Sequence, residues 1–350
     1  MSDVDWTSNT RYDRIEFEQV DPNDLDFVRE ELTGVDLRQS SLSFGYYTDT
    51  RVSGSLFFVN SNYIEGSLIR IHHYVDVWDY HQELGTFFVG NNSFDYAQGI
   101  NTNSVDLLSA LYGMQVEDWA WHYVISSGRY TKSVIQDMLD ICGRPGIISE
   151  SVSNVKFASA IIYEFGENSL ASLYDVCSKS NARVDVDGHG RVIINPYVEP
   201  KALTPQWTWD FNSINSTITS PITVSNNRLD LPGRVSVIYK NGDTEIASVA
   251  DASTASFGHP GRRGYRKTDT YSLSEMYPVT KSRADELAAD LLKESSSPII
   301  EYEFSSLYCP CKIGDGCLLS FADETKTCFV KNIEVSFKPG LEIKVLLKEV

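Results

Sequence analysis

The sequence predicts a β-rich α+β fold, and three observations support this. Alternating apolar and polar residues dominate residues 42–89 and 298–350, as in half-buried strands. Turn-forming residues such as Gly, Asn, Asp and Pro separate these runs. Apolar residues at helical spacing are confined to a few stretches. With 350 residues, 42% of them hydrophobic, the chain is long and apolar enough for roughly two to four modules.

The central stretch, residues 169–200, predicts a helix followed directly by a hairpin. SLASLYDVCSKSNA places Leu170, Leu173 and Val176 on one helical face, and Ser169 is expected to cap the helix. RVDVDGHGRVIINPY then alternates as two strands around a turn at 187–190. This small unit cannot bury its own apolar faces, so we expect it to lie between larger β-rich segments.

The turn also partly fits a calcium-binding loop. Counted from Asp185, Asp187 is third, His189 fifth and Gly190 sixth, as in an EF-hand. The twelfth position, however, is Pro196 where an EF-hand needs a bidentate Glu, and a strand follows in place of a helix. We therefore interpret this stretch as a hairpin that binds no metal.

The first 90 residues predict an acidic start followed by a meander of antiparallel strands. Residues 21–32, DPNDLDFVREEL, are expected to form a short helical turn or a loop. Residues 42–89 contain four strand-like runs, typical of a barrel or a sandwich. His72 and His73 are neighbours on one such strand, so they point to opposite sides and cannot bind one metal ion together. We expect both to be half exposed.

The rest of the chain predicts three further helices among strands. Residues 103–113 fit a short helix capped by Ser104, and 131–143 fit a helix capped by Thr131. The strongest helical pattern is KSRADELAADLLKES at 281–295, with one apolar and one charged face. Strands are expected within 207–250, including a hairpin at Asn241-Gly242, and again from 298 to the end.

Charge and cysteine content limit the partners and the compartment. A net charge of −18 argues against sequence-independent binding of nucleic acid, which depends on Lys and Arg, although it suits a wall past which DNA must slide. The N-terminus resembles no secretory signal, and no stretch is apolar enough to span a membrane, so we expect folding in a cytoplasm. The six cysteines are then expected to be buried free thiols rather than disulfides or zinc ligands.

No catalytic or cofactor site is predicted. G-x-S-x-G, H-E-x-x-H and the Rossmann glycine pattern are all missing from the sequence, and the spacing of the many carboxylates selects no pair. One basic loop, HPGRRGYRK at 259–267, stands out in this acidic chain. Such a loop could meet a phosphate or an acidic partner surface, although a solvated loop is the commoner explanation, and it lacks the Gly-Lys-Ser/Thr ending of a P-loop. If the loop has a function, we expect its cations, Arg262, Arg263, Arg266 and Lys267, to contact a partner.

Taken in order, these segments resemble the tail and baseplate hub proteins of tailed bacteriophages. The resemblance covers most of the chain and includes the N-terminal region of siphophage tail-associated proteins and the hub and late-control proteins of contractile tails. The segments that carry it are SGSLFFV, SLIRIHHY and LGTFFVG, then the helix-hairpin at 170–197, LPGRVSVIYKNG, GHPGRRGYRK, RADELAADLLKES and CKIGDGCLLSF.

The resemblance implies an architecture of two tail-tube-like β-barrel modules flanking smaller α/β modules. The corresponding boundaries are an N-terminal β-barrel module at 1–103, an α/β module at 104–200, a β module at 201–280, and a helix with a C-terminal β-barrel module at 281–350. It also implies a homotrimeric ring at the distal end of the tail tube, in a virion assembled in the host cytoplasm.

The partners implied by the resemblance are the tail tube protein, the distal tail protein, the tape measure protein and a tail fibre or receptor-binding protein, with genomic DNA passing through unbound. Two alternatives remain open. One is a tail-borne cell-wall hydrolase, which would need a carboxylate pair in a cleft. The other is a carbohydrate- or receptor-binding β protein, which exposed Trp and Tyr would favour.

Overall fold

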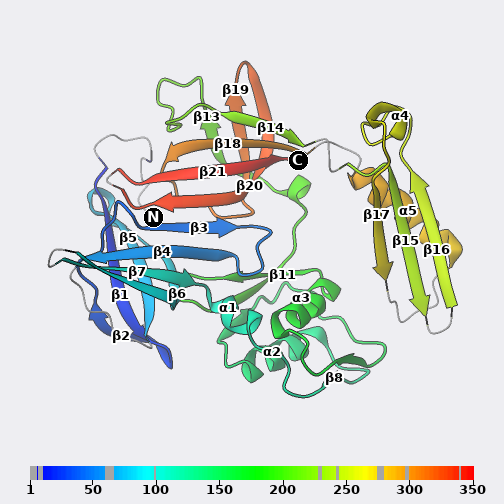
Figure 1. The fold of residues 1–350 in the computed structure, drawn as a ribbon, viewed down its shortest axis with the longest axis horizontal. Helices are drawn as coiled ribbons and strands as arrows, with labels where there is room; N and C mark the ends of the chain where they lie inside the picture. The colour runs from blue at the N-terminus through cyan, green and yellow to red at the C-terminus, as the bar shows by residue number, and fades with distance from the viewer. Residues whose placement is uncertain are drawn as a thin grey trace. The chain divides into compact units, whose positions relative to one another are not determined.

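Strands make up most of the regular structure, as the alternating pattern predicts. The structure, a computed structural model, describes residues 6, 11–59, 67–97, 100–227, 231–241, 244–273, 280–295, 299–338 and 340–350. The chain divides into two units: the first comprises residues 1–222, 303–348 and 350, and the second residues 223–302 and 349. Figure 1 labels their strands and helices.

The first unit is built on one large sheet. Its strands follow the order β18-β21-β20-β3-β4-β7-β6-β5-β1-β2, with β19 beside β20 and β13 beside β19. Their bounds are β1 Asp13–Asp21, β2 Asp24–Glu31, β3 Ser41–Gly45, β4 Val52–Val59, β5 Leu68–Val75, β6 Tyr80–Ala97, β7 Ile100–Leu108, β13 Pro205–Asp210, β18 Ile299–Leu307, β19 Gly316–Phe321, β20 Glu324–Ser336 and β21 Glu342–Glu349.

The N-terminal and C-terminal β segments belong to this same sheet. β20 pairs antiparallel with β3 over a register that runs from Asn332↔Gly45 to Ser336↔Ser41. The order of strands is an open path from β18 to β2, so the part of the chain that the structure describes contains no closed barrel. The expectation of a β-rich α+β fold is thus confirmed, whereas two separate barrels are not.

The prediction of a helical turn or loop at 21–32 is wrong. These residues form the end of β1 and the whole of β2, a hairpin whose second strand is the edge of the sheet. Seven of the eight residues of β2 are exposed, so the strand shows no apolar alternation to read. Its partner β1 pairs with β5, from Asp13↔Val75 to Val20↔Leu68, which is a contact between residues far apart in the sequence.

The α/β part of the first unit contains three helices around one core. The helices are α1 Ala110–Gln115, α2 Thr131–Ile141 and α3 Ser169–Lys179, and Figure 1 shows them grouped beside the large sheet. Short strands complete this part: β8 Tyr123–Ile125, β9 Gly146–Ile148, β10 Ile161–Tyr163, β11 Ala182–Val186 and β12 Val192–Pro196. Leu111, Ile135, Leu139, Leu173 and Val184 are fully buried in the shared core.

The predicted helix followed by a hairpin is confirmed as α3, β11 and β12, but the predicted caps are each one residue off. Asn168 rather than Ser169 caps α3, since its Oδ1 accepts a hydrogen bond from the backbone N–H of Ala171 at 3.1 Å. Thr131 is likewise the first residue of α2 and follows Tyr130. In both cases the adjacent position has the extended backbone that a cap requires.

The helix expected at 103–113 is mostly a strand. β7 extends to Leu108, and α1 begins only after Ser109, whose hydroxyl accepts a hydrogen bond from the N–H of Leu111 at 3.2 Å. Because β7 is paired on both sides, with β4 and β6, tertiary pairing overrides the helical reading of this stretch. Val105 and Leu107 are fully buried, at the period of a strand.

The second unit contains a three-stranded sheet and one long helix. β15 Arg234–Asn241 lies between β16 Thr244–Asp251 and β17 Thr268–Leu273, and β14 Thr223–Asn227 precedes them. α5 Lys281–Ser295 covers one face, where Ala284 and Ala288 pack against Val235 and Val237. The strongest helical prediction is therefore confirmed. Gly242 and Asp243, in the expected hairpin turn, lie outside the described residues.

All six cysteines are buried free thiols, as the sequence predicts. Among the described residues, no helix has both the length and the apolar character that a membrane crossing requires.

Candidate functional site

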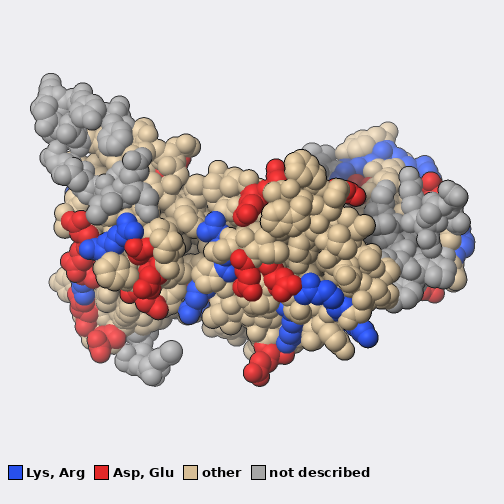
Figure 2. Space-filling view, turned by 90° about the horizontal axis from the view of Figure 1, so that it is seen from below, with Lys and Arg blue, Asp and Glu red and all other residues tan. Residues whose placement is uncertain are grey.

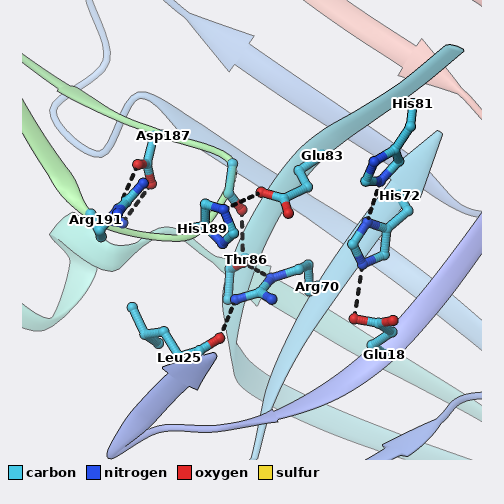
Figure 3. Close-up of polar contacts among 11 residues, drawn as sticks. Glu18, Leu25, Arg70, His72, His81, Glu83, Thr86, Asp187, His189 and Arg191 are labelled. Atoms are coloured by element: carbon cyan, nitrogen blue, oxygen red, sulfur yellow. Dashed lines mark hydrogen bonds and ion pairs between the residues drawn. The ribbon is translucent and has the colours of Figure 1, made fainter. Parts of the chain in front are cut away.

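A polar network lies on one face of the first unit's sheet, over β1, β5 and β6 (Figure 3). His72 on β5 is at its centre: its Nδ1 lies 2.9 Å from Nε2 of His81, and its Nε2 lies 2.9 Å from Oε2 of Glu18. His73 points to the other face, as predicted, where its Nε2 lies 2.7 Å from Oδ1 of Asp13. The expected half exposure is wrong, because His72 is 5% exposed and His73 is fully buried.

The hydrogen-bond directions in this network follow from the carboxylate. Ionised Glu18 only accepts, so the Nε2–H of His72 donates to it. The Nδ1 of neutral His72 is then an acceptor, and the Nε2–H of His81 must donate to it. Burial, and next the neighbouring His72, lower the pKa of His81 against the opposing effect of Glu83 and Glu18.

A second set of contacts joins this sheet face to the turn between β11 and β12. Arg70, which is 4% exposed, donates from Nε to Thr86 Oγ1 at 3.0 Å and from Nη2 to the carbonyl of Leu25. Thr86 Oγ1 donates in turn to the carbonyl of Gly188 at 2.7 Å. A Cβ on Gly188 would lie 2.8 Å from the backbone oxygen of Glu83, so the turn lies directly on β6. This arrangement holds the hairpin against the sheet.

The hairpin and the sheet line a partly open cavity of about 360 Å³. Apolar side chains from β6 and β20 line part of it, together with Arg183 and Asp185 and the thiols of Cys309 and Cys311. Arg183 donates to Asp185 at 2.9 Å, and burial raises the pKa of Asp185. A hydrogen bond with Cys309, then burial, raises the pKa of Cys311, so that thiol is a poor nucleophile.

These groups connect the parts of the first unit. Within the described ranges, no set of three or more His, Cys, Asp and Glu side chains is placed to hold a metal ion. This network was not predicted from the sequence, because His72, His81 and Arg70 contact their partners only once the strands have paired. The alternation of Arg70 and His72 on one face was the available signal, but nothing local identified β1 as the neighbouring strand.

The basic loop of the second unit divides into inward and outward cations. It contains the short helix α4, Pro260–Arg263, whose N-terminus is capped by His259. Arg263 donates to the carbonyl of Leu231 and to the hydroxyl of Tyr265, and Lys267 lies 3.5 Å from Asp269. Arg262 and Arg266 are exposed, and Arg262 lies 5.2 Å from the ring centre of Phe257. The expected partner contact stays a prediction for all four cations, of which Arg262 and Arg266 are the exposed ones.

The acidity of the chain belongs almost entirely to the first unit. Residues 223–302 contain 10 Lys and Arg and 11 Asp and Glu, which leaves 20 and 37 for the rest. In Figure 2 Asp and Glu side chains gather over the end of the first unit that carries β1 and β2. Residues 13–31 alone hold 8 acidic and 2 basic side chains. The basic loop therefore lies in the one unit that is nearly neutral.

No protein-family model matches this sequence, and no curated protein matches it. Solved structures do match over nearly its whole length. A tail protein from Neisseria meningitidis MC58 has a TM-score of 0.69 at 10% identity, with 96% of each chain covered. The 43 kDa tail protein of prophage MuSo2 from Shewanella oneidensis has a TM-score of 0.65 at 10% identity, with 95% of this chain and 97% of that chain covered.

A third similar structure comes from a secretion system. The E. coli c3393 protein, described as a component of the type VI secretion system with structural similarity to T4 bacteriophage tail proteins gp27 and gp5, has a TM-score of 0.51 at 9% identity, covering 92% of this chain and 77% of that chain. The resemblance seen in the sequence is thereby confirmed in the structure, and the chain has the fold of bacteriophage tail proteins.

Proposed function

We propose that this protein is a structural hub of a bacteriophage tail or baseplate. The observation that carries the proposal is the match in fold over at least 95% of this chain and of both tail proteins, one of which belongs to a prophage. A match of that extent includes the elements of both units, rather than one motif. The polar network and the cavity support a structural role, because their charged groups are used in contacts between strands.

In this proposal three copies form a ring at the distal end of the tail tube. The N-terminal and C-terminal β segments of each chain take the part of two tube-like modules, which gives the ring six similar positions. The excess of acidic residues in the first unit favours a channel wall that does not bind the phosphates of passing DNA. The partners are then the tail tube protein, the distal tail protein, the tape measure protein and a fibre or receptor-binding protein, in the virion.

Two measurements test this function: the mass of the assembled particle in solution and its negative-stain image. Sedimentation of the purified protein, alone and mixed with the tail tube protein of the same phage, is expected to give a particle of three chains. Negative-stain images are expected to show a ring. A chain that remains monomeric even with the tube protein contradicts the hub.

The proposal also includes that the hub has no catalytic or metal centre. Incubation with cell walls of the host is expected to release no soluble fragments, and elemental analysis is expected to find no stoichiometric metal. Zinc that disappears in the Cys309→Ser, Cys311→Ser variant, or lysis that one Asp or Glu substitution abolishes, would overturn this part.

A further inference from the structure

We propose that the basic loop of one copy binds the edge strand β2 of a second copy. The two surfaces are an acidic edge, formed by Asp26, Glu30 and Glu31 on β2, and a basic tip, formed by Arg262 and Arg266 around α4. This inference rests on the proposed ring and adds to it the contact that joins neighbouring chains.

The acidic edge has free charges beside exposed apolar side chains. Among the described residues, Asp26, Glu30 and Glu31 have no ion-pair partner. Phe27 and Val28, between them in the sequence, are 56% and 40% exposed. β2 is also the last strand of the sheet, so the outer side of its backbone has no neighbouring strand in the described part of the first unit. Charged side chains on an edge strand discourage pairing of its backbone with another strand, so the contact proposed here is made by the side chains of β2.

The basic tip has the complementary composition. Neither Arg262 nor Arg266 has an ion-pair partner among the residues that the structure describes. Phe257, two residues before the loop, and Tyr265, within it, are 39% and 48% exposed. Guanidinium groups form the strongest ion pairs with carboxylates, frequently through two parallel hydrogen bonds. Each surface therefore offers the charge and the apolar contact area that the other lacks.

The occupant of each surface is a second copy because one chain carries both halves of the contact. A contact between two different surfaces of identical chains is heterologous, and it closes into a ring when the rotation between neighbours permits. A twofold contact would instead need one self-complementary surface. Two acidic edges repel each other, as do two basic tips, so the charges exclude a contact of edge with edge or of tip with tip. A twofold pair in which each tip contacts the partner's edge is also compatible with the charges, and it is the proposed ring of three that selects the heterologous arrangement.

Charge reversal of the full-length chain tests the contact. The basic-tip variant has Arg262→Glu and Arg266→Glu, and the acidic-edge variant has Asp26→Lys and Glu30→Lys. In each, we expect the concentration needed for assembly to rise by about tenfold or more, because like charges then face each other. The variant with all four changes restores opposite charges and is expected to regain the mass of the unmodified assembly. Sedimentation velocity at low and high salt measures these masses.

An equimolar mixture of the two paired variants gives a sharper result. Each variant then fits only the other one, and a ring of three chains must contain at least one contact between copies of the same variant. We expect the mixture to form species with an even number of chains and no trimer. Lys156→Glu with Lys201→Glu is the matched control: it reverses two exposed cations elsewhere, and we expect it to leave assembly unchanged.

The possible results distinguish a failure of this contact between copies from a failure of the proposed hub function. If the unmodified chain and both paired variants all form trimers, the inference is overturned and the hub stands. If the chain assembles only with tail tube protein, the same variants are compared in that mixture. A chain that is monomeric throughout overturns both. Near-ultraviolet circular dichroism checks folding, and Arg262→Gln with Arg266→Gln, which only neutralises the tip, replaces any variant that misfolds.

Discussion

Buried polar residues of the first unit form hydrogen bonds that join one strand or turn to another. Arg70 and His72 lie next to each other on one strand face, and each is satisfied by a residue from another strand or turn. Buried polar groups are costly unless they are hydrogen-bonded, so each such contact fixes one strand or turn in its position.

Acidification is expected to destabilise the first unit through His81. Its pKa in the folded chain lies below its ordinary value, so the unfolded chain binds that proton more readily. The stability that neutral His81 contributes is present above about pH 6.5 and is lost as the pH falls through the lower folded value. Chemical denaturation at pH 7.5, 6.5 and 5.5 measures this. His81→Gln is expected to flatten the pH dependence, and an unchanged dependence would contradict the assignment.

Thr86→Val is expected to lower the free energy of unfolding by about 1–3 kcal/mol, because it leaves Arg70 Nε without an acceptor and the Gly188 carbonyl without a donor. Valine has nearly the same shape, so the change isolates the hydroxyl. Thr86→Ser keeps the hydroxyl and serves as the control. Equal losses in both variants, measured by urea denaturation, would show that packing of the methyl group matters more than the hydrogen bonds.

At the scale of secondary structure, the α3–β11–β12 segment is held by its own turns and caps. Asn168→Ala is expected to cost about 0.5–2 kcal/mol, since the N–H of Ala171 loses its acceptor. Asn168→Asp retains that acceptor and is the control. Thermal unfolding followed by circular dichroism compares them. A loss for Asn168→Ala no larger than that for Asn168→Asp would count against the cap.

Elements with local signals were predictable, whereas those created by distant pairing were not. The apolar face of α5 and the Gly-containing turn of the β11–β12 hairpin are local features, and both elements were predicted within one or two residues. The sequence of β2 shows no alternation of apolar and polar residues, because the strand is an exposed edge. β7 forms a strand where a helix was expected, because it pairs with β4 on one side and β6 on the other. The polar network was missed for the same reason, since Glu18 reaches His72 through the pairing of β1 with β5.

For the whole molecule, the uneven charge predicts that the two units respond differently to salt. The first unit carries nearly all of the net charge of −18, and such an excess destabilises a compact state by self-repulsion. Raising the salt concentration shortens the range of this repulsion to about 8–10 Å at 0.1–0.15 M. The second unit is nearly neutral, so salt screens little repulsion within it and is expected to change its stability little.

Differential scanning calorimetry, at a protein concentration low enough for the chain to be monomeric, is therefore expected to resolve two transitions. Between 20 and 300 mM NaCl the transition of the first unit is expected to rise by several degrees, because roughly 1 kcal/mol moves a midpoint by about 2–4 °C in a domain of that size. The transition of the second unit is expected to stay in place. Val237→Ala, in the core beneath α5, identifies the second unit by lowering its transition alone. A single transition, or equal shifts of both, would contradict the separation of charge and folding between the units.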